Sequence, residues 1–155
     1  MPVEPVPEGY HSVTAYLMVD GAAQALDFYK TAFGAEELMR MPGPGGKIGH
    51  AEMRIGDSPV MVTDEYPEMN AKGPRSFGGS PVHLHLYVED VDATVARAVK
   101  AGAKLLRPVE DQFYGDRSGS LEDPFGHVWH VATHKEDIPM DELRRRAAAR
   151  AQQSG

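Results

Sequence analysis

The sequence contains no cysteine, which excludes disulfide bonds, thiolate nucleophiles and zinc sites built from thiolates. It also lacks any apolar run close to the roughly 18 residues that a membrane-spanning helix requires. The first residues, MPVEPVPEGYH, are rich in proline and contain neither a basic segment nor an apolar one. They do not resemble a signal peptide, so we expect a cytoplasmic protein that does not contact a membrane.

Basic residues are in deficit. Lys and Arg number 16 against 23 Asp and Glu, giving a net charge of −7, so the chain has no basic excess to neutralise nucleic-acid phosphates and we expect no nucleic-acid partner. The arginines near the end, from Arg144 to Arg150, are interpreted as a solvated helix face. Sequences typical of a serine nucleophile elbow or an H-E-x-x-H zinc site are also absent, and the glycine-rich stretches 42–46 and 77–80 lack the strand-to-helix context of phosphate loops.

The chain is instead organised as a repeat. Residues 14–38 and 83–106 each contain an alternating strand, a helix, a Gly-Ala pair and a second strand. Val19 and Val88 occupy corresponding positions, 69 residues apart. Two similar halves usually pack as pseudo-symmetric partners, so the region between them is where we look for function.

Each half is predicted to have the order βαβββ. In the first half, alternation over residues 11–20 and helical spacing over 21–33 precede strands at 36–41, 48–55 and 59–63. In the second, a strand at 82–88 and a helix ending near Ala101, with Asp92 as its expected N-cap, precede three more strands. The predicted organisation is an extended Pro-rich arm at 1–9, a first module at 10–64, a linker at 65–81 that could cover the cleft, a second module at 82–138, and a C-terminal helix and tail at 139–155.

The stretches LMVDGAAQALDFYKTAFGAEEL, HLHLYVEDVDATVARAVKAGA and DPFGHVWHV resemble the vicinal oxygen chelate superfamily, which includes glyoxalase I, extradiol dioxygenases, fosfomycin-resistance enzymes and bleomycin-binding proteins. The tail LEDPFGHVWHVATHKEDI is similar to the PhnB-like branch. The resemblance implies an α+β fold in which two βαβββ modules form a U-shaped mixed β-sheet, with helices on the convex face and a ligand cleft on the concave face. It also implies a homodimer, which the Pro-rich arm and the C-terminal helix could clasp.

The resemblance further implies up to four metal ligands, from the first and fourth strands of each module. When each of these ligand positions is matched to this sequence, the residues found there are Thr14, Met61, His83 and His130. His83 and His130 are competent metal ligands, whereas Thr14 and Met61 suit no hard or borderline divalent ion. Glu52, on a strand where His50, Glu52 and Arg54 alternate, is the candidate third ligand or general base. One divalent ion (Zn, Ni, Mn or Fe) and no cofactor at all remain equally open.

Other side chains are candidates for ligand binding, each with a structural alternative. Tyr16, Tyr87 and Tyr114 could line the cleft or fill the mouth of the sheet. His85 and Met61 lie on the same expected face. Arg117 could bind an anionic group, although a salt bridge to Asp116 or Glu122 is the favoured interpretation. Trp129 is expected in the core, and His127 is expected to shape its loop.

Two functions of different classes therefore stay open. The first is a metal-assisted lyase, isomerase or dioxygenase in which His83 and His130 hold the ion and Glu52 completes the site or acts as base. The second is a metal-free protein of bleomycin-resistance type that sequesters an aromatic or cationic small molecule, for which the negative net charge is favourable.

Overall fold

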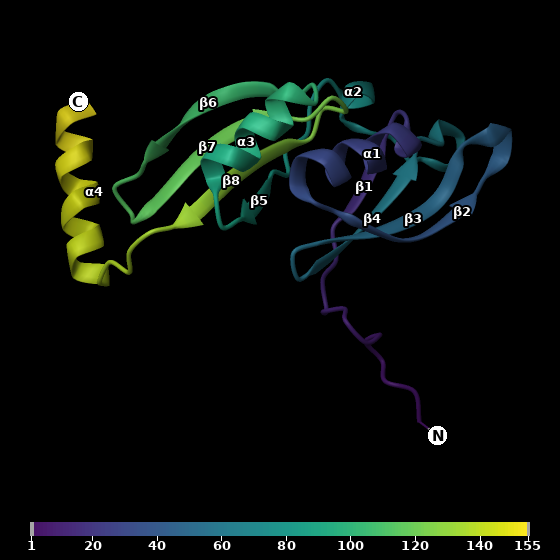
Figure 1. Cartoon of the computed structure of the whole chain (residues 1–155), viewed down its shortest axis with the longest axis horizontal. Helices are drawn as coiled ribbons and strands as arrows, with labels where there is room; N and C mark the ends of the chain where they lie inside the picture. The colour runs from purple at the N-terminus through teal and green to yellow at the C-terminus, as the bar shows by residue number, and fades with distance from the viewer. Residues whose placement is uncertain (1, 155) are drawn as a thin grey trace.

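The computed structural model describes residues 2–154 and contains two modules of the same order (Figure 1). The first comprises β1 Tyr16–Val19, α1 Ala22–Phe33, β2 Glu36–Pro42, β3 Ile48–Ile55 and β4 Ser58–Asp64. The second comprises β5 Leu84–Tyr87, α3 Val91–Lys100, β6 Lys104–Asp111, β7 Asp116–Glu122 and β8 Val128–His134. The predicted repeat of βαβββ and the α+β class are confirmed.

Each module folds into a four-stranded mixed sheet, in the order β1-β4-β3-β2 and β5-β8-β7-β6. The first strand pairs in parallel with the last in both cases, and the remaining pairs are antiparallel. The registers of the two parallel pairs correspond. Tyr16 lies opposite Met61 in the first module, and His85 lies opposite His130 at the equivalent place in the second. The offset of 69 residues seen in the sequence therefore holds at the level of individual backbone partners.

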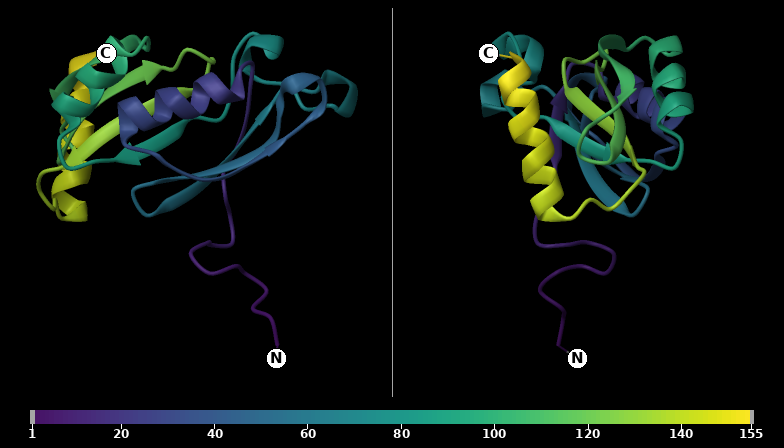
Figure 2. Two further views of the ribbon diagram at one scale, coloured as in Figure 1. Left: turned by 45° about the vertical axis from the view of Figure 1, so that its right-hand side comes forward. Right: turned by 90° about the vertical axis from the view of Figure 1, so that its left-hand side faces the viewer.

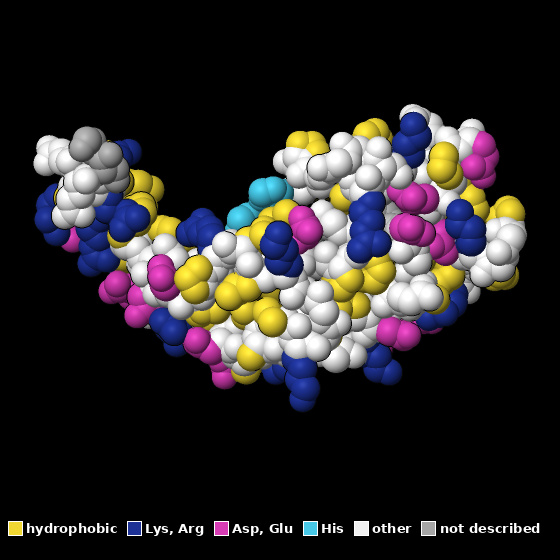
Figure 3. Space-filling model, turned by 90° about the horizontal axis from the view of Figure 1, so that it is seen from above, with side chains coloured by type: hydrophobic (Ala, Val, Ile, Leu, Met, Phe, Trp, Pro, Cys, Tyr) yellow, Lys and Arg dark blue, Asp and Glu magenta, His cyan; other side chains and the backbone are white. Residues whose placement is uncertain are grey.

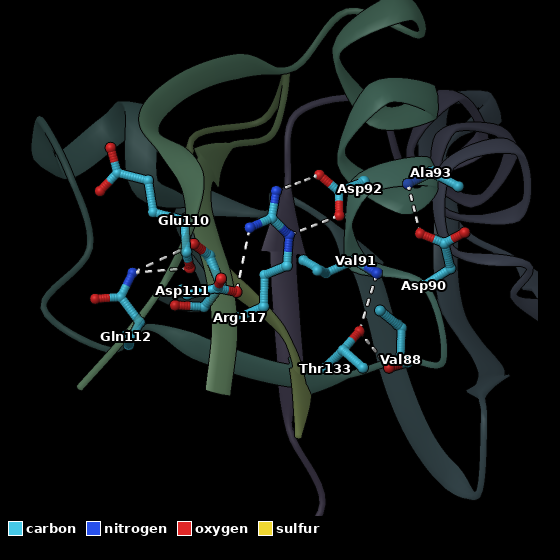
Figure 4. A network of polar contacts seen from close by, with 11 residues as sticks. Val88, Asp90, Val91, Asp92, Ala93, Glu110, Asp111, Gln112, Arg117 and Thr133 are labelled. Carbon is cyan, nitrogen blue, oxygen red and sulfur yellow. Dashed lines mark hydrogen bonds and ion pairs between the residues drawn. The ribbon is translucent and has the colours of Figure 1, made fainter. Parts of the chain in front are cut away.

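The two helices begin at equivalent anchors. The Asp64 carboxylate accepts hydrogen bonds from Gly21 N (3.0 Å) and Ala22 N (2.8 Å) at the start of α1. At the start of α3 the Thr133 hydroxyl, 69 residues after Asp64, accepts from Val91 N at 2.9 Å (Figure 4). Both side chains satisfy helix N–H groups that have no partner within the helix.

The predicted N-cap of α3 is wrong by two residues. Asp90, not Asp92, accepts the hydrogen bond from Ala93 N at 3.1 Å. Asp92 lies in the first turn of the helix and its carboxylate binds Arg117 instead. Both aspartates suit a helix start, because carboxylates are favourable near a helix N-terminus, so composition alone did not separate them.

The core lies between the sheets and the two helices, which contact each other on the same side of the molecule (Figure 1). Leu17 and Val19 of β1 point into it, and the central strands β3, β4, β7 and β8 also contribute buried residues. Trp129 is 3% exposed and packs against Tyr29 and Phe33, so its predicted place in the core is confirmed. Burial of this face fixes the register of these strands, since a slip of one residue would expose it.

One strand differs from its predicted bounds, and two other segments contain local irregularities. The first strand begins at Tyr16 rather than at residue 11, because its only partner, β4, begins its register with Met61 opposite Tyr16. Strand β6 extends to Asp111, passing two register shifts around Arg107. The linker contains a short 3₁₀ turn, Pro67–Met69, and a single helical turn, α2 Pro74–Phe77; another 3₁₀ turn lies at Pro44–Gly46.

The molecule is elongated, with β1 and β5 near its middle and β2 and β6 towards its ends (Figure 1). Helix α4, Met140–Ser154, stands beside the second module, and residues 2–9, which contain no helix or strand, extend away from the body (Figure 2). Within residues 2–154, no helix is long and apolar enough to cross a membrane.

Candidate ligand-binding site on the concave face

The face opposite the helices carries the polar and aromatic side chains of the first and last strands. Because Leu17 and Leu86 point towards the core, their neighbours Tyr16, His85 and Tyr87 point the other way, and all three are exposed. Seen from above, the molecule is a crescent with histidines on its inner side (Figure 3). The predicted distribution, with helices on the convex side and these residues on the concave side, is therefore found.

In the second module, His83 and His130 lie side by side, with 2.9 Å between His83 Nδ1 and His130 Nε2. The other nitrogen of His130, Nδ1, lies 2.7 Å from the hydroxyl of Ser120 on β7. Burial, followed by the charges of His83 and His85, lowers the pKa of His130, so its ring is neutral at pH 7. Ser120 was not found by sequence reasoning, although its place opposite His130 follows from the hairpin register.

His85 and the two tyrosines of this module extend the same surface. The His85 ring packs edge-on against Tyr87 at 4.7 Å and lies parallel to His130 at 6.3 Å. The negative charge of Asp116 raises the pKa of Tyr87, so its hydroxyl stays protonated. The Tyr114 hydroxyl lies 3.5 Å from Ser118 Oγ, and the ring is partly exposed. These groups offer flat aromatic contacts with polar edges.

In the first module, three polar side chains form a continuous chain of hydrogen bonds. The Tyr16 hydroxyl lies 2.9 Å from His50 Nδ1, and His50 Nε2 lies 2.8 Å from Glu52 Oε2. Tyr10, from the segment before β1, donates to the other oxygen of Glu52. The hydrogen bonds from Tyr10 and His50 lower the pKa of Glu52. Alternation placed His50 on this face, but no sequence signal assigned it a role.

The donor set does not fit a divalent metal ion within one chain. Thr14 and Met61 offer a weak hydroxyl and a soft thioether at two of the four expected positions. Glu52, the predicted third ligand, does not join His83 and His130; its carboxylate is engaged by His50 and Tyr10. Across residues 2–154, no three His, Asp or Glu side chains converge on a point where they could hold an ion.

Arg117 is held by two carboxylates. Its guanidinium donates to both oxygens of Asp92, at 2.8 and 3.0 Å, and to Asp111 at 3.2 Å (Figure 4). The favoured sequence interpretation of a salt bridge is right in kind but wrong in its partners, which are neither Asp116 nor Glu122. Asp116 instead lies 2.7 Å from His134. An arginine paired this way has less capacity left to bind an anionic ligand.

His127 connects the modules rather than lining the face. It is 8% exposed, and its Nε2 donates to the backbone carbonyl of Met18 at 3.0 Å. The turn before β8 is thereby joined to β1 of the other module. This agrees with the expected loop-shaping role of His127 and adds a function between modules that sequence spacing could not indicate.

Two hollows flank these strands. One, of about 170 Å³, lies between Tyr16, Met18 and the linker residues Phe77 and Pro81, so the linker borders the concave face. A larger one, of about 750 Å³, is lined by residues of the two helices and of the strands, among them Phe33, Leu86, Tyr87 and His134. We locate the candidate site on the concave face, because His83, His85 and His130 lie there together, whereas the larger hollow shares only Tyr87 with this cluster.

The contact between Tyr10 and Glu52 predicts a pH-dependent release of the N-terminal segment. The folded pKa of Glu52 lies below its ordinary value of 4.5, so the stabilisation is complete above that pH and is lost as the pH falls through the folded value. We expect the NMR signals of the Tyr10 ring to shift towards unfolded values as the pH falls below 4.5. Glu52→Gln should weaken the contact already at pH 7. Unchanged Tyr10 signals at low pH would contradict the assignment.

Comparison with known proteins agrees with this architecture. Residues 10–131 match the family described as Glyoxalase/Bleomycin resistance protein/Dioxygenase superfamily. An uncharacterized protein of Mycobacterium tuberculosis, Rv0887c, is 46% identical over 136 residues, covering 86% of this chain and 80% of the relative. The anthracycline biosynthesis protein DnrV of Streptomyces peucetius is 33% identical over 124 residues, covering 79% of this chain and 41% of DnrV.

The fold itself has solved counterparts. TioX from Micromonospora sp. ML1 superposes with a TM-score of 0.63 at 28% identity, covering 80% of this chain and 98% of TioX. The two βαβββ modules, the concave face and the matched residues lead to one conclusion: the chain belongs to the glyoxalase/bleomycin resistance protein/dioxygenase superfamily.

Proposed function

We propose that the concave face binds a small organic molecule without the help of a metal ion. The observation that carries the proposal is the donor set at the four expected ligand positions. Thr14 and Met61 replace two ligands, and the His83–His130 pair has no carboxylate beside it within the described chain. Two imidazoles hold a divalent ion tightly only when further donors complete the coordination.

The side chains that remain favour an aromatic ligand, and the charge favours a cationic one. His85 and Tyr87 offer ring surfaces, and Met61, partly buried beside Tyr16, offers a polarisable wall. The net charge of −7 raises the local concentration of cations. The relative DnrV is named for anthracycline biosynthesis, which supports an aromatic natural product as the first compound to test. We place Tyr16, Met61, His85, Tyr87 and Tyr114 around this ligand, and we expect a cytoplasmic homodimer.

One observation favours metal-assisted chemistry as the second candidate. His83 Nδ1 and His130 Nε2 lie 2.9 Å apart, as two ligands of one ion could, and the lowered pKa of His130 keeps its nitrogen free of a second proton. A third donor would then have to come from a second copy of the chain. In that case the protein would act as a lyase, isomerase or dioxygenase, with Glu52 as a candidate base.

Metal content and ligand binding separate the two functions. We expect untagged protein, purified without chelator, to contain far less than one Zn, Ni, Mn or Fe per chain by plasma mass spectrometry, and to remain so after incubation with these ions and desalting. Near-stoichiometric metal that disappears in a His83→Ala/His130→Ala double variant would overturn the proposal.

We also expect the fluorescence of an anthracycline, doxorubicin, to change saturably on titration with the protein. Tyr87→Ala and His85→Ala should each weaken binding by about fivefold to tenfold, because each removes a ring contact worth about 1 kcal/mol. Lys100→Ala, an exposed change on α3, is the matched control and should leave the affinity unchanged. Equal affinity in all variants would place the ligand elsewhere.

A further inference from the structure

The hydrogen-bond chain of the first module has the layout of an activated hydroxyl. Its members lie on two strands, Tyr16 on β1 and both His50 and Glu52 on β3, and they meet on the concave face, where Tyr16 is 44% exposed. The hydroxyl lies 2.9 Å from His50 Nδ1, and the opposite nitrogen of the same ring lies 2.8 Å from the Glu52 carboxylate. A hydroxyl, a base within hydrogen-bond reach and a third group that orients the base are the parts that activate side-chain nucleophiles.

The contacts also determine which nitrogen of His50 carries the proton. The Glu52 carboxylate only accepts hydrogen bonds, and its lowered pKa keeps it ionised, so the nitrogen facing it, Nε2, must be the donor. In the neutral tautomer that this contact selects, Nδ1 is an acceptor, and the Tyr16 hydroxyl donates to it. The Tyr16 oxygen can then accept a hydrogen bond of its own, and its side chain is exposed to a ligand.

We propose that Tyr16 accepts a proton from a ligand on the concave face, with His50 as its base and Glu52 as the group that positions His50. As the Tyr16 oxygen takes the proton of an acidic hydroxyl, such as that of a phenol, its own proton passes to His50 Nδ1. The ligand keeps the electron pair of the broken O–H bond and becomes an anion. The imidazolium is paired with Glu52, and return of the two protons restores the resting state.

The neighbouring groups are compatible with this role. His50 and Glu52 are each about one-fifth exposed, so the charge pair is partly shielded from water. Across the sheet, β2 places Met41 opposite His50 and Met39 opposite Glu52, and β4 places Met61 opposite Glu52. None of these residues competes for the protons. Tyr10, the remaining polar partner, contacts the far oxygen of Glu52 and does not interrupt the chain.

This acid–base activity goes beyond the proposed binding function, and the activation of Tyr16 by His50 requires neither a metal ion nor a bound ligand. It can therefore be tested on the protein alone with benzenesulfonyl fluoride, which reacts with phenolic oxygens of high phenolate character. The Tyr16 oxygen forms a bond to sulfur, the S–F bond breaks, fluoride leaves, and the phenolic proton passes to His50. Peptide mass spectrometry then reports the rate at each tyrosine.

We expect Tyr16 to be modified about tenfold faster than Tyr87 and Tyr114, which are also exposed but whose hydroxyls contact Asp116 and Ser118, respectively, rather than a histidine. His50→Gln and Glu52→Gln should each slow the reaction of Tyr16 about tenfold, while Tyr87 reacts as before, which reports an intact fold. Tyr10→Phe is the matched control, since it alters Glu52 but leaves the chain to Tyr16 in place. A Tyr16 rate that is unchanged by both His50→Gln and Glu52→Gln would overturn the proposal.

Discussion

Replacing Asp123 with alanine is expected to lower the free energy of unfolding by about 4 kcal/mol, one of the largest effects available in this chain. Asp123 is 2% exposed and accepts four hydrogen bonds. Oδ2 receives Tyr29 Oη at 2.5 Å and Trp129 Nε1 at 2.9 Å, and Oδ1 receives the backbone N–H groups of Phe125 and His127. Removing the carboxylate leaves all four donors buried without their partner.

The same contact extends between modules, because Tyr29 lies on α1 and Asp123 in the turn before β8. The Tyr29 pKa is raised well above its ordinary value by burial and then by the charge of Asp123, so the phenol stays protonated and continues to donate. We therefore expect Asp123→Ala to loosen the packing of one module on the other as well as the turn itself.

Chemical denaturation followed by circular dichroism measures the loss. Two milder variants form a graded series: Asp123→Asn keeps an acceptor for the two backbone groups but turns an amide towards Tyr29 and Trp129, and Tyr29→Phe removes one donor. We expect losses of about 2 and about 1 kcal/mol, respectively. If Asp123→Ala lowered the free energy of unfolding by less than Tyr29→Phe does, the four contacts would not stabilise the fold as described.

The second large effect is expected at the equivalent helix anchors, Asp64 and Thr133. Asp64→Ala should cost about 3 kcal/mol, because Asp64 is 6% exposed and satisfies three backbone groups, including Ile48 N at 2.7 Å as well as the two at the start of α1. Thr133→Ala should cost about 1 kcal/mol, since its hydroxyl accepts from one helix group and donates to Val88 O.

Equilibrium unfolding of the two variants tests the difference between the modules. The matched control is Asp57→Ala, an exposed aspartate in the turn between β3 and β4, which should change the stability by less than about 0.5 kcal/mol. Equal losses for Asp64→Ala and Thr133→Ala would mean that the negative charge and the extra contact to Ile48 contribute nothing beyond a neutral cap.

The sequence by itself determined the repeat, the order of elements and the sidedness of the strands. Val19 and Val88 gave an offset that the register of both sheets reproduces, with Tyr16 opposite Met61 and His85 opposite His130. These features are readable because they depend on the period of two along a strand and on which face must leave water. Trp129 was assigned to the core for the same reason.

Tertiary structure decided how individual side chains meet. The chain Tyr16–His50–Glu52 joins residues of β1 and β3, which are not neighbours in the sheet, and Asp123 contacts Tyr29 across 94 positions of sequence. Arg117 binds Asp92 on α3 and not Asp116, the acidic residue beside it in the sequence. Such contacts require donors and acceptors within about 3 Å and suitably aligned. That geometry depends on how the two modules pack and on the rotamer of each side chain. No pattern of residue types along the chain specifies either of these.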